Sequence, residues 1–227
     1  MTLNTEGKIR ELTGKILKAI NISCISDGQL RSYIQSVLER KSNDELISLA
    51  ANLGSTIKAF KDKINSHAAR YRESRFEAEL TVGQIFTADT YSFPETVVLP
   101  KTCLPLSKSL YREEDSMNNF EYRVIQKVAD LDNVVFWHRN LEMKGFCING
   151  YINHYPDFIV VTKKGIIIML ETKGDDRQNP DSATKLKLGK TWASTAGPKY
   201  RYFMVFDNKP LPGAHSLNDF TALLSQL

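Results

Sequence analysis

Residues 155–173 read YPDFIVVTKKGIIIMLETK, two apolar runs separated by Lys163-Lys164-Gly165. The runs, Phe158 to Thr162 and Ile166 to Lys173, have the length and the β-branched content of strands. A three-residue loop with glycine in the left-handed conformation commonly joins the two strands of a hairpin. The stretch therefore predicts an antiparallel hairpin, and the rest of the fold is expected to be arranged around it.

The register of this hairpin decides which side chains meet. If Thr162 pairs with Ile166, Asp157 lies directly opposite Glu171, and Lys173 shares the face of Glu171 because strand side chains alternate. Opposed side chains on one face have Cβ atoms roughly 4.5–5.5 Å apart, and like charges at that distance repel each other. A divalent cation bound between the carboxylates would reverse the sign of that interaction.

Two carboxylates and an amine in this arrangement indicate a metal-dependent hydrolytic site. Magnesium prefers oxygen ligands, so Asp157, Glu171 and a backbone carbonyl at Thr172 are the predicted ligands, with manganese as a substitute. Such an ion polarises a phosphoryl oxygen and lowers the pKa of a bound water. Lys173 is the predicted catalytic lysine, and the expected product is a cut phosphodiester. Either short motif alone would fit an ordinary salt bridge on a strand.

The flanking sequence predicts a compact α/β unit. Phe120, Val124 and Val128 recur at helical spacing, and residues 134–137 have the character of a strand. After the hairpin, residues 183–196 have helical spacing and residues 200–206 again resemble a strand. The predicted order is α-β-β-β-α-β, a mixed central sheet flanked by helices.

The N-terminal part differs in character. Residues 1–80 are predicted to be helical, with a charged stretch near their end that favours one long helix. Residues 81–110 contain three prolines and are expected to form an extended or β linker in which Val97–Leu99 makes a short strand. The predicted division is therefore a helical region over 1–80, a linker over 81–110 and an α/β domain over 111–227.

The distribution of charge and the cysteine content bear on the binding partner and the cellular compartment. The net charge is only +4, but residues 163–201 hold nine Lys/Arg against four Asp/Glu. Lys185, Lys187 and Lys190 within this segment are predicted to contact DNA phosphates, although solvated helix lysines are the ordinary alternative. Three scattered cysteines argue against a zinc site and a disulfide framework, and they favour a reducing cytoplasm. No apolar run is long enough for a membrane span, and the N-terminal residues lack the apolar core expected of a secretory signal.

The pattern around several other polar and aromatic residues is less specific. Glu121 lies at the border of the apolar helix stripe and is a candidate accessory residue that approaches the metal, although the pattern alone slightly favours a solvent-facing glutamate. His138 and His154 flank the site and receive no role. Trp137 and Trp192 are expected to pack in the core.

The second half of the chain resembles the C-terminal endonuclease domain of type III restriction enzyme Res subunits, within the PD-(D/E)XK nuclease superfamily. The resemblance is carried by these runs: Asn119-Phe120-Glu121, Trp137-His138-Arg139-Asn140, His154 to Val160, Glu171 to Asp175, Lys185-Leu186 and Gly189 to Ala193. It implies a PD-(D/E)XK core, metal ligands at Asp157 and Glu171, and a catalytic lysine at Lys173.

The resemblance also implies partners. Res subunits act on double-stranded DNA together with a helicase motor and a methyltransferase subunit. This sequence has no phosphate-binding loop, so no ATP site is expected, and residues 1–110 resemble the region that would follow a motor. The chain is then expected to be a piece of a longer subunit or one product of a split gene. Two alternatives stay open: a non-catalytic DNA-binding module of the same fold, and a repair or junction-resolving nuclease of the superfamily.

Overall fold

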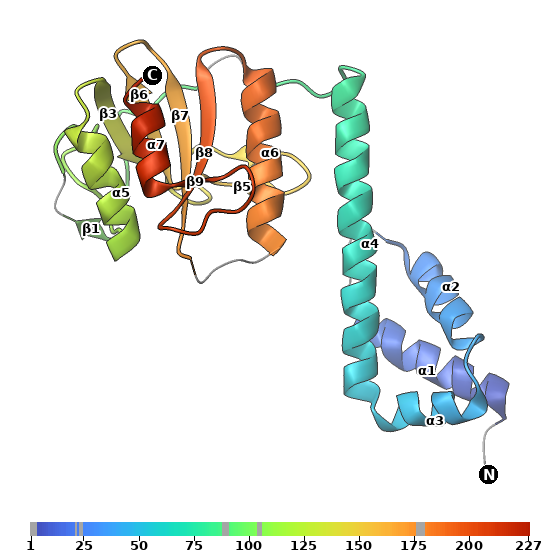
Figure 1. Cartoon of the computed structure of the whole chain (residues 1–227). Helices are drawn as coiled ribbons and strands as arrows, with labels where there is room; N and C mark the ends of the chain where they lie inside the picture. The colour runs from blue at the N-terminus through green and yellow to red at the C-terminus, as the bar shows by residue number, and fades with distance from the viewer. Residues whose placement is uncertain (1–3, 21, 23–24, 88–90, 104–105, 176–179) are drawn as a thin grey trace. The chain divides into compact units, whose positions relative to one another are not determined.

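A computed structural model describes residues 4–20, 22, 25–87, 91–103, 106–175 and 180–227 of the chain. It divides into two compact units, residues 1–77 and residues 78–227. Figure 1 shows the helices of the first unit and the sheet of the second.

The first unit is entirely helical in its described residues. It contains α1 (Thr5–Ala19), α2 (Asp27–Leu38), α3 (Asn43–Ala51) and the start of the long helix α4 (Leu53–Thr81). Ser26 and Ser42 begin α2 and α3 with reciprocal capping boxes, which satisfy backbone N–H groups of the first turns. A buried cluster of aliphatic side chains and Phe60 holds the helices together. The predicted helical character of this region and its long charged helix are confirmed.

The second unit is an α/β domain. It contains β1 (Thr102–Cys103), β2 (Glu114–Asp115), α5 (Asn119–Asp130), β3 (Val134–Arg139), β4 (Ile148–Asn149), β5 (Asn153–His154), β6 (Phe158–Thr162), β7 (Ile167–Lys173), α6 (Pro180–Ala196), β8 (Tyr200–Phe206), β9 (His215–Ser216) and α7 (Leu217–Leu224). The central sheet has the order β3-β6-β7-β8-β9. Its β3–β6 and β6–β7 pairs are antiparallel, whereas β7–β8 and β8–β9 are parallel. The predicted mixed sheet flanked by helices is confirmed.

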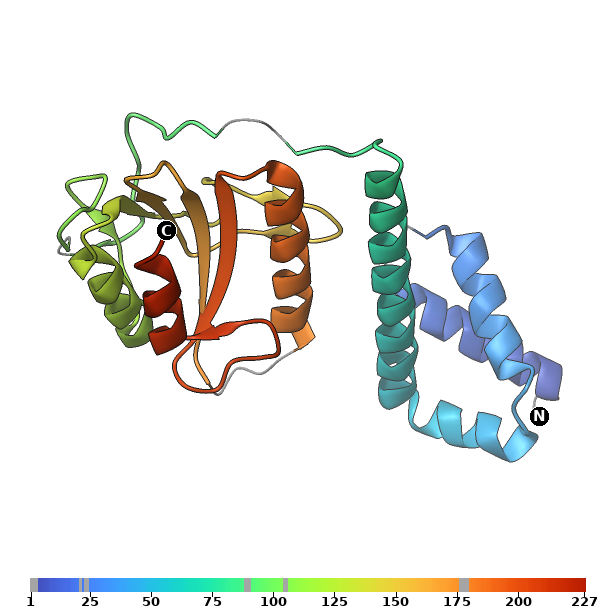
Figure 2. The same ribbon diagram turned by 45° about the horizontal axis from the view of Figure 1, so that its top comes forward.

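Helices cover both faces of this sheet, with α5 and α7 on one side and α6 on the other (Figures 1 and 2). Side chains of α5 such as Val124 and Val128 pack in one buried cluster with Phe158, Val160 and Leu170 of the hairpin strands. Because side chains alternate along a strand, Met169, Glu171 and Lys173 face the opposite side, toward α6. The faces of β7 therefore differ: one continues the apolar core and the other carries charge.

The segment before the sheet is less regular than predicted. The expected strand at Val97–Leu99 is wrong: these residues form no strand, and Val98 is 77% exposed. An apolar run needs a partner strand or a packed face to become a strand, and this one has prolines on both sides. Further along, Ser109 forms a parallel bridge to Trp137, so the chain near residue 109 lies along the edge of β3.

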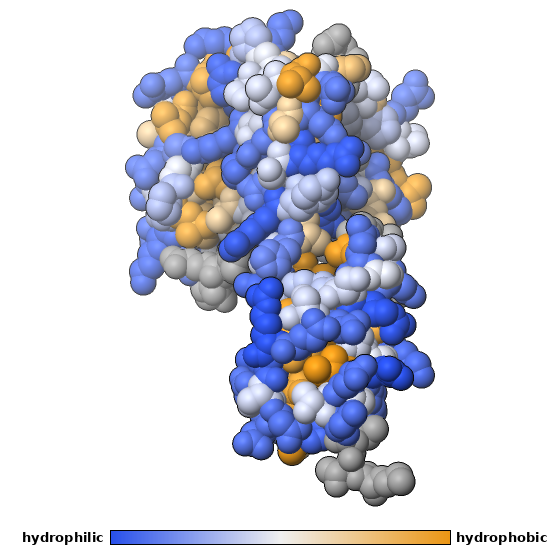
Figure 3. Space-filling view, turned by 90° about the vertical axis from the view of Figure 1, so that its right-hand side faces the viewer, coloured by the Kyte–Doolittle hydropathy of each residue, from blue (hydrophilic) through white to orange (hydrophobic). Residues whose placement is uncertain are grey.

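The face shown in Figure 3 is mainly hydrophilic, with patches of apolar residues between the hydrophilic ones. Within the described residues, no helix has both the length and the apolar character that a membrane span requires.

Candidate active site

The β6–β7 hairpin has the predicted turn and register. Gly165 adopts a φ of 74°, its N–H donates to the carbonyl of Thr162 at 2.9 Å, and the Thr162 N–H donates to the carbonyl of Ile166 at 3.0 Å. Farther along, Phe158 pairs with Leu170. The ladder ends at this pair, and the same register continued by one residue would bring Asp157 opposite Glu171. The two carboxylates are near enough for the charge of Asp157 to act on Glu171.

Asp157 is held in place by hydrogen bonds on its side chain and its backbone. Its Oδ2 accepts bonds from the backbone N–H and the hydroxyl of Thr172, both at 2.7 Å. Its carbonyl accepts a bond from the Asn140 N–H at 2.9 Å. The Asn140 side chain also donates to the Pro156 carbonyl at 2.8 Å. The carboxylate is therefore fixed just before the start of β6 by its neighbours on β7 and after β3. The Thr172 carbonyl remains the predicted third oxygen ligand.

Glu171 is buried, with its two oxygens in different surroundings. Only 2% of the residue is exposed. Its Oε1 lies 2.7 Å from Nζ of Lys173 and 3.7 Å from Nζ of Lys185. Its Oε2 is buried without a hydrogen-bond partner and lies 4.0 Å from Nε2 of His154. A buried, unpartnered carboxylate oxygen is costly unless something binds it, which makes Oε2 the natural position for a cation.

Burial shifts the protonation of this carboxyl group. Burial, with a further contribution from the Asp157 charge, raises the pKa of Glu171 to about 7, although Lys173 and Lys185 oppose the shift. The free carboxyl group is then partly protonated at neutral pH. A cation would favour the ionised form, so binding it would release a proton.

The three lysines of α6 lie in two different environments. Lys185 turns toward Glu171 and lies 3.4 Å from Asp181, with 24% of its side chain exposed. Burial favours the neutral amine, but Glu171 and Asp181 outweigh it and raise the pKa of Lys185. Lys187 and Lys190 are exposed on the same helix. The predicted DNA contact therefore suits Lys187 and Lys190 better than Lys185, which belongs to the carboxylate cluster.

His154 and Tyr202 also belong to the site, although no role was predicted for either. His154 is fully buried, and its Nε2 lies 2.8 Å from Oη of Tyr202. Burial, aided by the charges of Lys185 and Lys173, lowers the pKa of His154 to about 3, so the ring is neutral. Burial, with Glu171 and Asp157, raises the pKa of Tyr202 well above its usual value. A neutral imidazole and a protonated phenol thus line the Oε2 side of Glu171.

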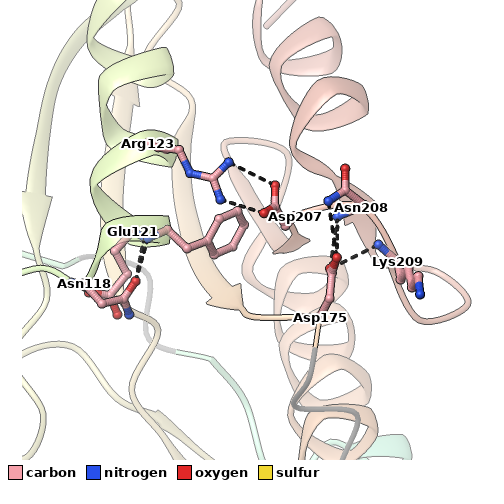
Figure 4. A network of polar contacts seen from close by, with 8 residues as sticks. Asn118, Glu121, Arg123, Asp175, Asp207, Asn208 and Lys209 are labelled. Atoms are coloured by element: carbon pink, nitrogen blue, oxygen red, sulfur yellow. Dashed lines mark hydrogen bonds and ion pairs between the residues drawn. The ribbon is translucent and has the colours of Figure 1, made fainter.

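Glu121 is placed differently from the prediction. Its Oε2 accepts a bond from the Asn118 N–H at 2.9 Å in a capping box and lies 3.1 Å from the Arg139 guanidinium. The same guanidinium stacks over the Phe158 ring at 4.7 Å. Phe158 faces α5, so Glu121 lies on the opposite face of the sheet from Glu171. The expected approach of Glu121 to the metal is not what the structure shows: this glutamate lies in the first turn of α5 beside Asn118 (Figure 4), and its carboxylate pairs with Arg139.

The remaining candidates are structural. His138 is buried, with Nδ1 3.1 Å from Oε2 of Glu114. Trp137 is fully buried, as expected. Trp192 is half-buried and packs edge-on against Phe146 and Tyr200.

A second polar network lies where β7 and β8 end (Figure 4). Asp175, two residues after Lys173, accepts bonds from the backbone N–H groups of Asn208 at 3.0 Å and Lys209 at 3.1 Å. Arg123 of α5 pairs with Asp207 at 2.6 Å. These contacts connect the chain that follows Lys173 to the end of the neighbouring strand.

The donor set fits a hard divalent cation. Asp157 and Glu171 supply carboxylate oxygens, and the unpartnered Oε2 of Glu171 is a ligand position already stripped of water. In the described part of the chain, no group of three or more His, Cys, Asp or Glu side chains is arranged to hold a metal. An ion here would therefore complete its shell with backbone oxygen and water, which magnesium tolerates well and zinc does not.

Comparisons with known protein families, curated proteins and solved structures found no match. The functional assignment consequently depends on the geometry of the site.

Proposed function

We propose that this protein is a magnesium-dependent DNA endonuclease of the PD-(D/E)XK type, corresponding to the nuclease part of a type III restriction enzyme Res subunit. The observation that carries the proposal is Glu171 on β7 beside Asp157, which directly precedes β6, with Nζ of Lys173 2.7 Å from Oε1 of Glu171 and the other Glu171 oxygen buried and unpartnered.

The topology supports this proposal. The elements α5, β3, β6, β7, α6 and β8 follow the α-β-β-β-α-β order expected for such nucleases, with the small β4–β5 pair inserted between β3 and β6. The acidic positions occur on β7 and directly before β6, on neighbouring strands of the sheet. Fold alone does not define function, so the argument rests on the site.

Each side chain of the site has a separate role in the proposed reaction. Asp157 and Glu171 would hold the cation, which when bound polarises a phosphoryl oxygen and acidifies a water. Thr172 keeps the Asp157 carboxylate oriented through its two bonds to Oδ2. Lys173 stabilises negative charge that develops on the phosphate. Lys185 adds a second positive charge at the Glu171 carboxylate.

The partners follow from the same proposal. The substrate is double-stranded DNA, with a helicase motor and a methyltransferase subunit acting alongside. The chain itself lacks a phosphate-binding loop for ATP. A cytoplasmic setting accords with three scattered cysteines.

A second candidate is a non-catalytic DNA-binding module. The observation in its favour is that Lys173 and Lys185 both lie against Oε1 of Glu171 and neutralise that side of the carboxylate. A repair or junction-resolving nuclease would share the catalytic site and differ only in substrate shape.

The deciding experiment is cleavage of supercoiled plasmid with magnesium, manganese, calcium or chelator. The proposal expects nicked and linear DNA with magnesium or manganese, and none with calcium or chelator. The Asp157→Asn variant is the matched control for contaminating nuclease. DNA binding without any cation-dependent cleavage would favour the binding module, and preference for branched over linear duplex would favour the junction-resolving enzyme.

A further inference from the structure

One nitrogen of His154 lies between two oxygens of the site. Its Nε2 is 2.8 Å from Oη of Tyr202 and 4.0 Å from Oε2 of Glu171. The first distance is a hydrogen bond and the second is too long for one. An imidazole nitrogen offers either one N–H or one lone pair, so it serves one partner at a time. Tyr202 occupies it, and Oε2 is left without a donor.

The position of Tyr202 is fixed from the other side by α6. A Cβ atom built on Gly189 would come within 2.5 Å of three atoms of the Tyr202 ring. The ring therefore lies against the helix backbone at a distance that only glycine allows. This packing sets where the hydroxyl can reach, and it reaches the imidazole.

We propose that Tyr202 is a positioning residue. It keeps His154 from donating a hydrogen bond to Oε2 of Glu171, so that Oε2 stays available to a divalent cation. Without the hydroxyl, the freed imidazole would need only a small turn to donate its N–H to Oε2. It would then compete with the cation for the same oxygen. This inference rests on the proposed function in one respect, that the ligand of Glu171 is magnesium or manganese.

The test is a manganese titration of the full chain by calorimetry, without DNA. Tyr202→Phe keeps the ring and removes the hydroxyl, and it should weaken manganese binding by about 10-fold, the scale of a lost partner behind a metal ligand. Adding His154→Leu to this variant should recover most of the lost manganese affinity, because no ring nitrogen remains to form a hydrogen bond with Oε2. A purely structural role for Tyr202 would make the double variant worse, not better.

Two further variants make the result decisive. Gly189→Ala leaves every polar group in place but displaces the Tyr202 ring, so it should also weaken manganese binding. Tyr111→Phe is the matched control, since its hydroxyl bonds to the Pro94 carbonyl, and it should bind manganese like the wild type. Thermal unfolding without manganese identifies variants that fail to fold.

The outcomes separate this inference from the proposed function. Wild-type affinity in Tyr202→Phe, or no recovery in the folded double variant, would overturn the role of Tyr202 alone. If the wild type binds manganese no better than Asp157→Asn, the proposed metal site fails, and this inference fails with it.

Discussion

Nζ of Lys173 lies 2.7 Å from Oε1 of Glu171, two residues earlier on the same strand. The amine therefore contacts the carboxylate that is proposed to hold the cation. In the proposed mechanism, this contact would place the lysine beside the phosphate without making it a ligand of the cation.

Lys173→Met should slow cleavage much more than it weakens manganese binding. In the proposed mechanism the amine stabilises charge in the transition state and is not a ligand, so a rate loss of roughly 100-fold is expected with manganese affinity changed only a few-fold. Single-turnover cleavage and calorimetry measure the two effects separately. Lys127→Met, exposed on α5 across the sheet, is the control. Equal losses of rate and affinity in Lys173→Met would identify a structural lysine.

Asp157→Asn and Glu171→Gln should each abolish cation-dependent cleavage, by on the order of 1,000-fold or more, while the fold is retained. Each change keeps the shape of the side chain and removes one charged ligand. Circular dichroism checks the fold, and plasmid cleavage measures activity. A folded variant that cuts at the wild-type rate would rule out its residue as a ligand.

Glu171→Gln should also change how stability depends on pH. Because the pKa of Glu171 rises to about 7 in the folded protein, the folded state binds an extra proton between its unfolded pKa and pH 7. Without a cation, this group therefore makes the wild type more stable as pH falls from 8 to 5. We expect the glutamine variant to melt a few degrees above the wild type at pH 8, and the difference to shrink by pH 5. A melting-temperature difference independent of pH would contradict the shift.

DNA binding should depend steeply on salt through the exposed face of α6. Replacing Lys187 or Lys190 with alanine is expected to reduce the slope of log affinity against log salt by about 1 each, the loss of one phosphate contact. Lys127→Ala, on α5 across the sheet, is the control. Fluorescence anisotropy with a labelled duplex at several salt concentrations, with chelator present, makes the measurement. If the slope is unchanged in both variants, these lysines of α6 do not contact DNA.

Asp175 should stabilise the fold in a pH-dependent way. Bonds from the backbone N–H groups of Asn208 and Lys209 lower the pKa of Asp175. Its contribution is therefore present above the unfolded pKa and is lost as pH falls toward the folded one. Asp175→Ala should melt below the wild type at pH 7 and approach it near pH 3, measured by thermal unfolding. Glu113→Ala is the exposed acidic control, and the same deficit at both pH values would refute the linkage.

The sequence predicted the hairpin well because its signals are local. Gly165 and the lengths of the two apolar runs determine the register, which pairs Phe158 with Leu170. The sequence could therefore predict that Asp157, Glu171 and Lys173 lie near one end of the hairpin, and their roles stay predictions.

Contacts between distant parts of the chain were not accessible in the same way. His154 and Tyr202 are 48 residues apart and meet only because β8 pairs beside β7 and α6 presses on the Tyr202 ring. Periodicity placed Glu121 at the edge of an apolar stripe, but nothing in the local sequence indicated that its carboxylate would form an ion pair with Arg139. The one available clue was Asn118 three residues before Glu121, a capping-box spacing that favours the structural role.

The chain near Ser109 has a practical consequence for dissecting this protein. Trp137 donates its N–H to the Lys108 carbonyl and accepts a bond from the Leu110 N–H, both at 2.9 Å, so this segment shields the outer edge of the five-stranded sheet. Cutting the chain at residue 111, where the sequence placed the domain boundary, would strip that cover away. The bare edge could then recruit a strand from another molecule, and the shortened protein would be prone to aggregate.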